Sequence, residues 1–310
     1  MSMKQLKKHN KYDNIKPRKE EKMKEQKYII KNCNTFELKD IFECGQCFRF
    51  NKQEDESYTG VVGNNVINVK KIDNEIHIKS VGQDNLEELV VNYFDLNRNY
   101  EQIKDKLSKI DENMQKSISY GKGIRILNQD LWETIISFII SANNNIPRIK
   151  GIIDRMSERY GKKIIFEGKE YYTFPTIDEL SKASVEDLRA LGLGFRDVRV
   201  YETTKIIKNK EIDLEQLKNE KDFNKVRNTL LTLPGVGPKV ADCILLFSTL
   251  KRWEAFPIDV WVRRVMNELY IKNPDETKVK KEEIEKIAYE KFGNLAGIAQ
   301  QYLFYWKREA

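Results

Sequence analysis

The sequence predicts an α+β fold that is mainly helical, in which an N-terminal antiparallel β domain packs on a helical bundle containing a helix–hairpin–helix motif. Residues 28–120 hold short alternating or apolar runs separated by turn residues, as antiparallel strands do. From residue 121 onward the apolar residues recur at helical spacing. A glycine-rich turn near residue 235 joins two helical segments. With 310 residues and 40% hydrophobic content, the chain can bury a sizeable core in about two domains.

The chain begins with a basic segment, residues 1–27, which holds ten Lys/Arg against four Asp/Glu and few apolar residues. This composition predicts a disordered tail. The tail either holds DNA non-specifically or only keeps the protein soluble, and the sequence favours neither role. It carries +6 of the net charge of +7, so residues 28–310 carry only +1. Any nucleic-acid surface on the folded body must therefore be a local patch.

Residues 28–120 are expected to form the β domain. Tyr58–Val62, Val66–Lys70 and Glu75–Ser80 are predicted strands, because each alternates or runs apolar. Gly63-Asn64-Asn65 and Asp73-Asn74 separate these strands and are typical hairpin connections. Two helices are expected to follow, at Asn85–Phe94 and Tyr100–Ile110.

Residues 121–310 are expected to form the helical domain. Asp130–Ala142 and Ile146–Tyr160 are amphipathic segments with Asn143-Asn144-Asn145 between them. Ser184 followed by Asp187 has the form of a capping box, which begins a helix. Short helices are expected at Thr176–Lys182 and Ser184–Leu191, and Gly192-Leu193-Gly194 interrupts the chain before a helix through Ile207.

The cysteines and histidines argue against several kinds of site. Four cysteines in so long a chain do not indicate a disulfide framework. Cys44 and Cys47 form a C-x-x-C pair, but no second pair of ligands stands near to complete a zinc site. The only histidines are His9 and His77, which disfavours Ser–His–Asp and His-rich metal catalysis. No apolar run approaches the ~20 residues of a membrane span and no secretory signal is present. We therefore expect a soluble intracellular protein without membrane contact, and a monomer.

The motif that carries most of the chemistry is the helix–hairpin–helix at residues 222–250. Asp222–Leu231 and Pro238–Leu250 are predicted helices, and Leu233–Gly237 (LPGVG) turns between them. Pro238 suits the first position of a helix, where its missing N–H costs nothing. The turn presents backbone N–H groups at the positive end of the second helix, which can bind a phosphate without side-chain charge. These groups belong to Gly235, Val236 and Gly237. A compact α-hairpin without DNA contact is an equally good interpretation of the turn alone.

Lys239 makes the hairpin chemically unusual. It falls in the first turn of the second helix, where the helix dipole disfavours cations, and local violations of this kind are expected at functional sites. The same dipole favours the neutral, nucleophilic amine. Asp259 stands twenty residues later, just before an apolar helical run through Tyr270, where it is either a helix N-cap or a catalytic carboxylate. An amine beside a carboxylate suits cleavage of a glycosidic bond, because the carboxylate stabilises positive charge on the sugar while the amine attacks.

The run Leu233–Cys243 (LPGVGPKVADC), with Phe256-Pro257-Ile258-Asp259, resembles the helix–hairpin–helix DNA glycosylases, and within them the 8-oxoguanine DNA glycosylases of the eukaryotic type. Further short segments that resemble the family occur in the same order as in its members, between about residues 40 and 306. They are Gly45-Gln46, Phe48-Arg49, Ser141–Ile146, Arg148, Gly192–Arg196, Ala299-Gln300 and Leu303-Phe304. The resemblance implies an enzyme that flips oxidised guanine out of double-stranded DNA and excises it, opposite cytosine. It makes Lys239 the Schiff-base nucleophile and Asp259 its carboxylate partner. After base loss, the imine permits β-elimination at the abasic site.

The resemblance also implies a lesion pocket. The Gly45 carbonyl would accept the N–H that oxidised guanine carries at N7 and guanine lacks, which discriminates well because guanine would leave this buried acceptor facing a lone pair. Gln300 would bind the Watson–Crick edge, Phe304 would stack on one face of the base, and Cys243 would cover the other face. Without the family, Phe304 and Cys243 are ordinary core residues and Gly45 only makes a turn.

A second implied group of residues contacts the opposite strand. Asn143 would fill the gap left by the flipped nucleotide, and Phe195 would wedge beside it. Arg148 and Arg196 would donate to the orphaned cytosine, which presents two acceptors on its freed edge. Such groups offset part of the few kcal/mol that base extrusion costs.

Two features bear on cofactors. Other helix–hairpin–helix glycosylases end in a four-cysteine iron–sulfur cluster, but no cysteine follows Cys243 here, so no such cluster and no required cofactor are expected. A structural monovalent or divalent cation at the hairpin carbonyls of Leu231, Leu233 and Val236 is consistent with the resemblance. Trp261 departs from the pattern, since many relatives carry a histidine there.

Two other functions remain open at this level. A monofunctional alkylpurine glycosylase would use an Asp-activated water with no lysine nucleophile, and Lys239 argues against it. A non-catalytic DNA-binding module built on the same hairpin would bind without turnover and would not need the Lys239–Asp259 pair.

Overall fold

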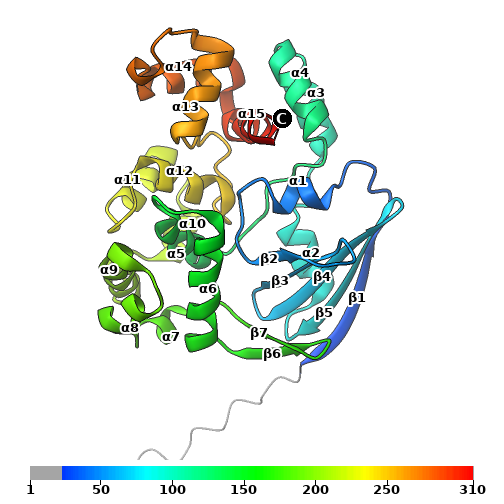
Figure 1. The fold of residues 1–310 in the computed structure, drawn as a ribbon, viewed down its shortest axis with the longest axis vertical. Helices are drawn as coiled ribbons and strands as arrows, with labels where there is room; N and C mark the ends of the chain where they lie inside the picture. The colour runs from blue at the N-terminus through cyan, green and yellow to red at the C-terminus, as the bar shows by residue number, and fades with distance from the viewer. Residues whose placement is uncertain (1–22, 310) are drawn as a thin grey trace, which may run out of the picture.

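The N-terminal part of the protein is built around a five-stranded antiparallel sheet (Figure 1), here in a computed structural model that describes residues 23–309. The strand order is β1-β5-β4-β3-β2, so β2 to β5 form a meander and β1 pairs with β5. Gly63 (φ +57) and Asp73 (φ +52) adopt the left-handed conformation that tight hairpin turns require. The strands are β1 (Lys24–Ile30), β2 (Phe50–Lys52), β3 (Tyr58–Val62), β4 (Asn65–Ile72) and β5 (Glu75–Gly82).

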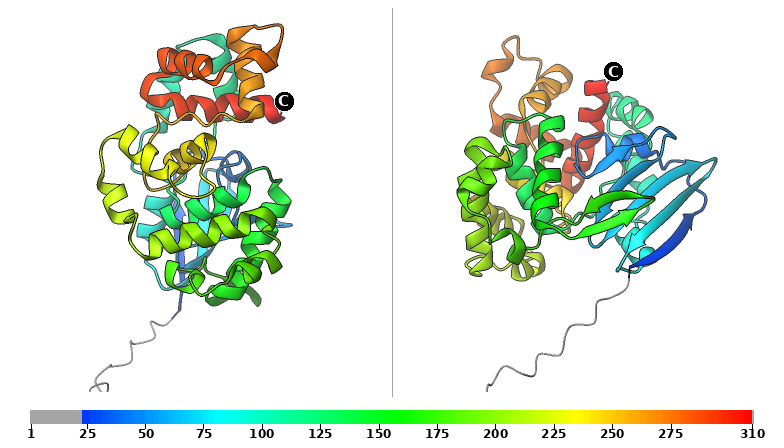
Figure 2. Two further views of the ribbon diagram at one scale, coloured as in Figure 1. Left: turned by 90° about the vertical axis from the view of Figure 1, so that its left-hand side faces the viewer. Right: turned by 60° about the horizontal axis from the view of Figure 1, so that its bottom comes forward.

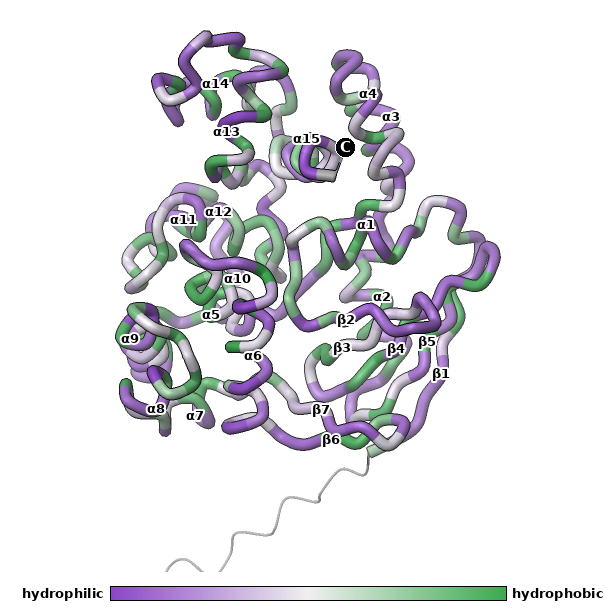
Figure 3. The backbone as a smooth tube through the Cα atoms, in the orientation of Figure 1, coloured by the Kyte–Doolittle hydropathy of each residue, from purple (hydrophilic) through white to green (hydrophobic). Residues whose placement is uncertain are grey.

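The two faces of the sheet are covered differently, because successive residues of a strand point to opposite sides. Ile67 and Val69 of β4 belong to a buried cluster with α1 (Leu38–Phe42) and α2 (Leu86–Tyr93). Val66, between them, packs on the other face against Ile164 of β6. The edge strand β1 is largely hydrophilic (Figure 3).

The helical part contains one hairpin that the sequence patterns did not reveal, β6 (Lys163–Phe166) and β7 (Lys169–Tyr172). It extends from the end of α6 to the sheet, so it links the two parts (Figure 1). The helices are α3 (Tyr100–Ser108), α4 (Glu112–Tyr120), α5 (Leu131–Ser141), α6 (Ile146–Tyr160), α7 (Ile177–Leu180), α8 (Val185–Ala190), α9 (Asp197–Lys208), α10 (Leu214–Asn219), α11 (Phe223–Leu231), α12 (Pro238–Phe247), α13 (Val260–Met266), α14 (Lys281–Phe292) and α15 (Ala296–Glu309), with short 3-10 turns at Gly194–Arg196, Glu276–Lys278 and Gly293–Leu295 and a π turn at Asn267–Ile271.

Helices α5 and α12 form the centre of the helical part. In α12 every residue from Val240 to Phe247 is buried, and in α5 only Glu133 and Ser141 are partly exposed. Pro238 stands at the start of α12, as expected from the sequence, and Asp130, expected inside the helix, is the N-cap of α5. The expected α+β architecture, with an antiparallel sheet followed by a mainly helical part, is confirmed.

The expected division at residue 120 does not separate two bodies in space. Helices α3 and α4 lie beside α15 at the other end of the chain, as all three views show (Figures 1 and 2). Leu107 and Met114 from these helices join the same hydrophobic core as Tyr302 from α15. Residues 100–120 therefore complete the C-terminal helices rather than the β domain.

The expected tail also has a different boundary. Strand β1 begins at Lys24, so residues 24–27 belong to the sheet and not to a tail. Residues 1–22 lie outside the described residues. Within residues 23–309, no helix has the length and apolar content that a bilayer crossing requires.

Candidate active site and nucleic-acid interface

The hairpin between α11 and α12 leaves its backbone open to a ligand. Gly235 has φ +86, and a Cβ there would lie 2.9 Å from Cδ of Arg199, so only glycine fits this position. Gly237 is exposed, and a Cβ there would have nothing within 4 Å. No side chain caps the N-terminus of α12. A phosphate can therefore approach the free N–H groups of this turn.

Lys239 lies in the first turn of α12 and is half-buried beside Cys243, one helical turn away. Its Nζ lies 5.5 Å from the centre of the Phe138 ring. Burial raises the pKa of the Cys243 thiol to about 11, while the charge and side-chain hydrogen bond of Lys239 oppose the rise and Asp259 adds to it. The charges of Lys239 and Asp259 therefore both act on this thiol. Within residues 23–309, no carboxylate lies within 4.0 Å of Lys239 Nζ to neutralise it.

Asp259 is the N-cap of α13. Its backbone is extended and its Oδ1 accepts the N–H of Val262 at 2.9 Å. The buried residues Phe256 and Ile258 hold the preceding segment in the core. The N-cap role that the sequence allowed is therefore real, and it fixes the carboxylate at the site rather than excluding it from the chemistry.

Gly45 lies in the turn between α1 and β2, with φ +84. The fully buried Gln46 fixes this turn: its Oε1 accepts the N–H of Leu127 at 2.8 Å, and its Nε2 donates to the carbonyls of Ile41 and Arg125 at 2.9 and 2.8 Å. Sequence reasoning gave Gln46 no role. The signal was its place beside a glycine, although nothing local showed that its amide would satisfy three backbone groups.

Helix α15 supplies the facing wall. A Cβ on Gly45 would lie 3.8 Å from Cε1 of Phe304, which is half-buried. Gln300, one turn earlier, is buried and its Oε1 accepts a hydrogen bond from Nε2 of Gln301 at 3.2 Å. Gly45 and Phe304, far apart in sequence, are thus brought together.

The proposed contacts with the opposite strand gather on two adjacent loops. Asn143 is exposed in the left-handed conformation (φ +50) between α5 and α6. Arg148 is exposed, and its Nη2 donates to the Gly192 carbonyl at 3.3 Å. Phe195 is 55% exposed, with the guanidinium carbon of Arg196 4.2 Å from its ring centre.

Arg196 has a structural role that the sequence did not predict. It is 1% exposed, and it donates to the carbonyls of Ala142 (2.8 and 2.6 Å), Asn143 (2.7 Å) and Leu193 (3.2 Å). Burial lowers its pKa, and the neighbouring charges of Arg148 and Arg199 add to this effect. Three of its hydrogen bonds therefore hold the loop that carries Asn143, and the fourth goes to its own turn at Leu193.

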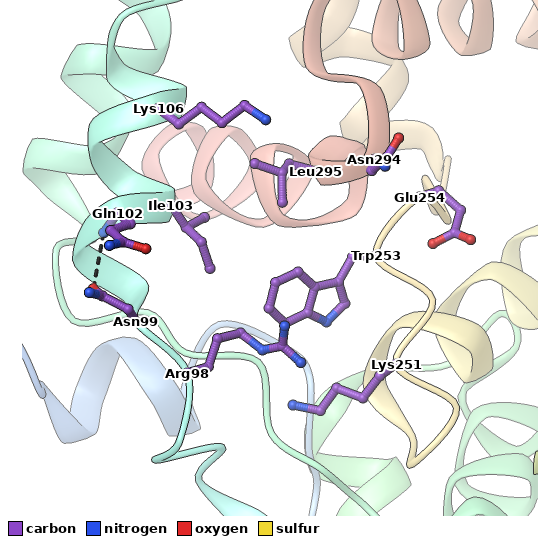
Figure 4. Close-up of a pocket in the computed structure, with 10 residues that line it drawn as sticks. All are labelled: Arg98, Asn99, Gln102, Ile103, Lys106, Lys251, Trp253, Glu254, Asn294 and Leu295. Atoms are coloured by element: carbon purple, nitrogen blue, oxygen red, sulfur yellow. Dashed lines mark hydrogen bonds between the residues drawn. The ribbon is translucent and has the colours of Figure 1, made fainter.

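A separate cavity of about 570 Å³ lies at the N-terminal end of α15 (Figure 4). Two of its cations are already engaged: the guanidinium carbon of Arg98 lies 4.0 Å from the ring centre of Trp253, and Lys251 pairs with Asp95 at 2.9 Å. None of the candidate site residues lines this cavity.

The cysteines and acidic residues form no metal centre among the described residues, where no three His, Cys, Asp or Glu side chains gather. All four cysteines are buried and free. Burial raises the pKa of Cys44 to about 12, which keeps the C-x-x-C pair in the unreactive thiol form.

Two family models match the chain in sequence. Residues 27–135 match the N-terminal domain of 8-oxoguanine DNA glycosylase, and residues 136–291 match the helix–hairpin–helix superfamily of base excision DNA repair proteins. The chain belongs to the 8-oxoguanine DNA glycosylases. This glycosylase is 33% identical to a probable N-glycosylase/DNA lyase of Methanothermobacter thermautotrophicus, over 72% of this chain and 75% of the relative. It is 31% identical to the N-glycosylase/DNA lyase of Saccharomyces cerevisiae, over 86% and 82%.

The glycosylase also resembles a solved structure over nearly its whole length. The 8-oxoguanine glycosylase/lyase of Clostridium acetobutylicum, in complex with double-stranded DNA containing cytosine opposite 8-oxoguanine, superposes with a TM-score of 0.84. The two chains are 45% identical, and the match covers 93% of this chain and 98% of the other. The protein is therefore a base-excision repair enzyme with glycosylase and lyase activities, and not a non-catalytic binding module.

Proposed function

We propose that this glycosylase flips 8-oxoguanine out of duplex DNA, excises it with Lys239 as nucleophile, and cleaves the abasic site by β-elimination. The observation that supports the proposal is the position of Lys239 in the first turn of α12 and of Asp259 at the N-cap of α13, both near enough for their charges to act on the Cys243 thiol. The substrate is supported by the Clostridium acetobutylicum enzyme, whose complex contains 8-oxoguanine.

The chemistry follows from these side chains. Lys239, after giving up a proton, attacks C1′ of the deoxyribose while the C1′–N9 bond breaks and its electron pair leaves with the base, which takes a proton. Asp259 stabilises the positive charge that develops on the sugar. Loss of the ring oxygen's bond to C1′ gives an imine with Lys239, and removal of a C2′ proton then expels the 3′ phosphate. Because Val262 donates to only one carboxylate oxygen, the other remains available to the sugar.

The lesion pocket is assigned to the residues that face one another across α15 and the Gly45 turn. The Gly45 carbonyl accepts the N7–H of the lesion, Phe304 stacks on one face of the base and Cys243 covers the other. Gln300 binds the Watson–Crick edge, with its Nε2 donors and the second lone pair of its Oε1, while the hydrogen bond from Gln301 to that oxygen orients the amide. Burial of these groups gives discrimination, since an unpaired buried acceptor costs about 1–3 kcal/mol.

Duplex DNA is held by two other surfaces. The N–H groups of Gly235 and Gly237 bind a backbone phosphate, whereas the Val236 N–H, which the sequence also suggested for this role, donates to the Leu233 carbonyl. Asn143 and Phe195 occupy the gap in the helix, and Arg148 donates to the orphaned cytosine. Arg196 contributes by fixing the Asn143 loop, and one guanidinium N–H beyond its four bonds is left for the cytosine.

The same hairpin offers a cation site. The carbonyls of Leu231, Leu233 and Val236 would hold a monovalent or divalent ion that neutralises part of the phosphate charge. The Leu233 carbonyl accepts the N–H of Val236 at 3.0 Å and keeps a second lone pair for the ion. Exchange of K⁺ for a large organic cation at constant ionic strength should then weaken DNA binding.

Borohydride trapping on a duplex with a single 8-oxoguanine tests the proposal. The wild type should form a covalent adduct, and Lys239→Gln should bind the duplex without forming one. Trapping of Lys239→Gln at the wild-type level would reassign the nucleophile. Excision by the wild type without any trapped adduct would indicate a water nucleophile and a monofunctional enzyme.

A further inference from the structure

Arg308 lies against both walls of the proposed lesion pocket. Its Nη1 is 3.4 Å from the position that a Gly45 Cβ would occupy. Its guanidinium carbon is 5.1 Å from the centre of the Phe304 ring, and its Nη2 donates to the carbonyl of Glu43. The side chain is half-buried and comes from the last turn of α15.

The spacing along α15 shows which part of a purine Arg308 would meet. Gln300, Phe304 and Arg308 are four residues apart, so they share one helix face at steps of about 6 Å. With Phe304 stacked on the middle of the base and Gln300 at its Watson–Crick edge, Arg308 lies at the opposite end of the purine's long axis. That end carries C8. The position of Gly45 also places Arg308 near C8. The Gly45 carbonyl is assigned to N7, which is bonded to C8, and Arg308 lies beside Gly45.

Oxidation changes guanine at these two adjacent atoms. N7 gains a hydrogen and becomes a donor, while C8 gains a carbonyl oxygen and becomes an acceptor. A backbone carbonyl such as that of Gly45 can detect only the first change. A guanidinium carries donors only and matches the second change, because unmodified guanine presents a C8–H there.

We propose that Arg308 is a specificity-determining residue of the lesion pocket, whose guanidinium donates to the C8 carbonyl of the oxidised purine. The proposal rests on the lesion pocket assigned above. Arg308 also has a structural role, because its hydrogen bond to the Glu43 carbonyl connects the Gly45 turn to α15. A test must therefore separate reading of the C8 oxygen from support of the turn.

The test is single-turnover excision by full-length wild type, Arg308→Leu and Arg308→Lys on two duplexes that differ at one atom. One contains 8-oxoguanine and the other 8-thioguanine, which keeps the N7–H but replaces the oxygen by a weakly accepting sulfur. A charge-assisted hydrogen bond predicts that Arg308→Leu slows 8-oxoguanine excision roughly 10- to 100-fold. Excision of 8-thioguanine should fall less than about threefold, and Arg308→Lys should restore part of the preference for oxygen.

The control is Lys307→Leu, which removes a neighbouring cation that pairs with Glu268 and should leave both rates unchanged. Equal losses on both duplexes, or no loss, would overturn the proposal and leave Arg308 as a support of the turn. Binding gives a second readout: in the Lys239→Gln background, Arg308→Leu should lower the ratio of affinities for 8-oxoguanine and guanine duplexes. If the wild type excises neither base, the proposed function itself is refuted. The wild-type reactions alone show this outcome, so it is distinguishable from failure of the Arg308 proposal.

Discussion

Replacement of Arg196 by methionine separates two roles that a buried arginine at a DNA interface can have. The substitution keeps the length of the side chain but removes hydrogen bonds to Ala142, Asn143 and Leu193. A hydrogen bond from a charged group contributes about 1.5–3 kcal/mol, but the four bonds are not additive and the loop carbonyls regain water. We expect a total loss of about 3 kcal/mol, which corresponds to a fall in Tm of roughly 5 °C for a chain of 310 residues.

The assay pairs thermal unfolding with single-turnover excision opposite each of the four bases. Arg196→Met should unfold early and excise slowly opposite all four, because the Asn143 loop is displaced. Arg148→Met should keep its Tm and lose roughly 10- to 100-fold of the preference for cytosine, since one good base contact is worth about 1–3 kcal/mol. An Arg196→Met variant that melts like the wild type yet loses the cytosine preference would refute this reasoning and make Arg196 the direct reader.

Three further predictions concern the carboxylates and the tail. Asp259→Asn should keep its Tm, because an amide oxygen can still cap Val262, while excision falls about 100-fold or more in the same assay; near-normal excision would leave only the capping role. Burial raises the pKa of Glu133 from 4.5 to about 7, so the wild type loses stability as the pH rises through this interval. In urea unfolding, Glu133→Gln should exceed the wild type by about 1–2 kcal/mol at pH 8, less than the full shift because the side chain is partly exposed, and should match it near pH 4; a constant difference would contradict this origin. Deletion of residues 1–22, which hold eight Lys/Arg against three Asp/Glu, should weaken binding of undamaged DNA and flatten its salt dependence, whereas an unchanged slope would mean that the segment only aids solubility.

Local chemistry made much of the fold predictable. The hairpin turns of the sheet and the N-caps at Asp130 and Ser184 depend on residues within four positions of one another, so the sequence displays them directly. The start of α12 is also predictable from local residues, namely Pro238 and the glycines that precede it.

Other elements depend on packing that no local pattern shows. Helix α15 has buried residues on several sides, among them Ile298, Gln301 and Leu303, so it lacks the one-sided pattern by which an amphipathic helix is recognised. Strands β6 and β7 have four residues each, too few for a clear alternation. The burial of Arg196 was equally hidden, because arginine is rarely buried and its neighbour Phe195 is exposed.

The packing of α3 and α4 on α15 has a consequence for the order in which the protein forms during synthesis. These two helices leave the ribosome early, but their partner follows about 180 residues later, so they must wait with an apolar face uncovered. The wall of the lesion pocket at Phe304 arrives with the same late helix, whereas the Gly45 turn and the hairpin are made long before. A nascent chain can thus present a phosphate-binding hairpin with Lys239 while it still lacks the Phe304 wall that selects a base, and lesion recognition and the closing of the core arrive together with α15.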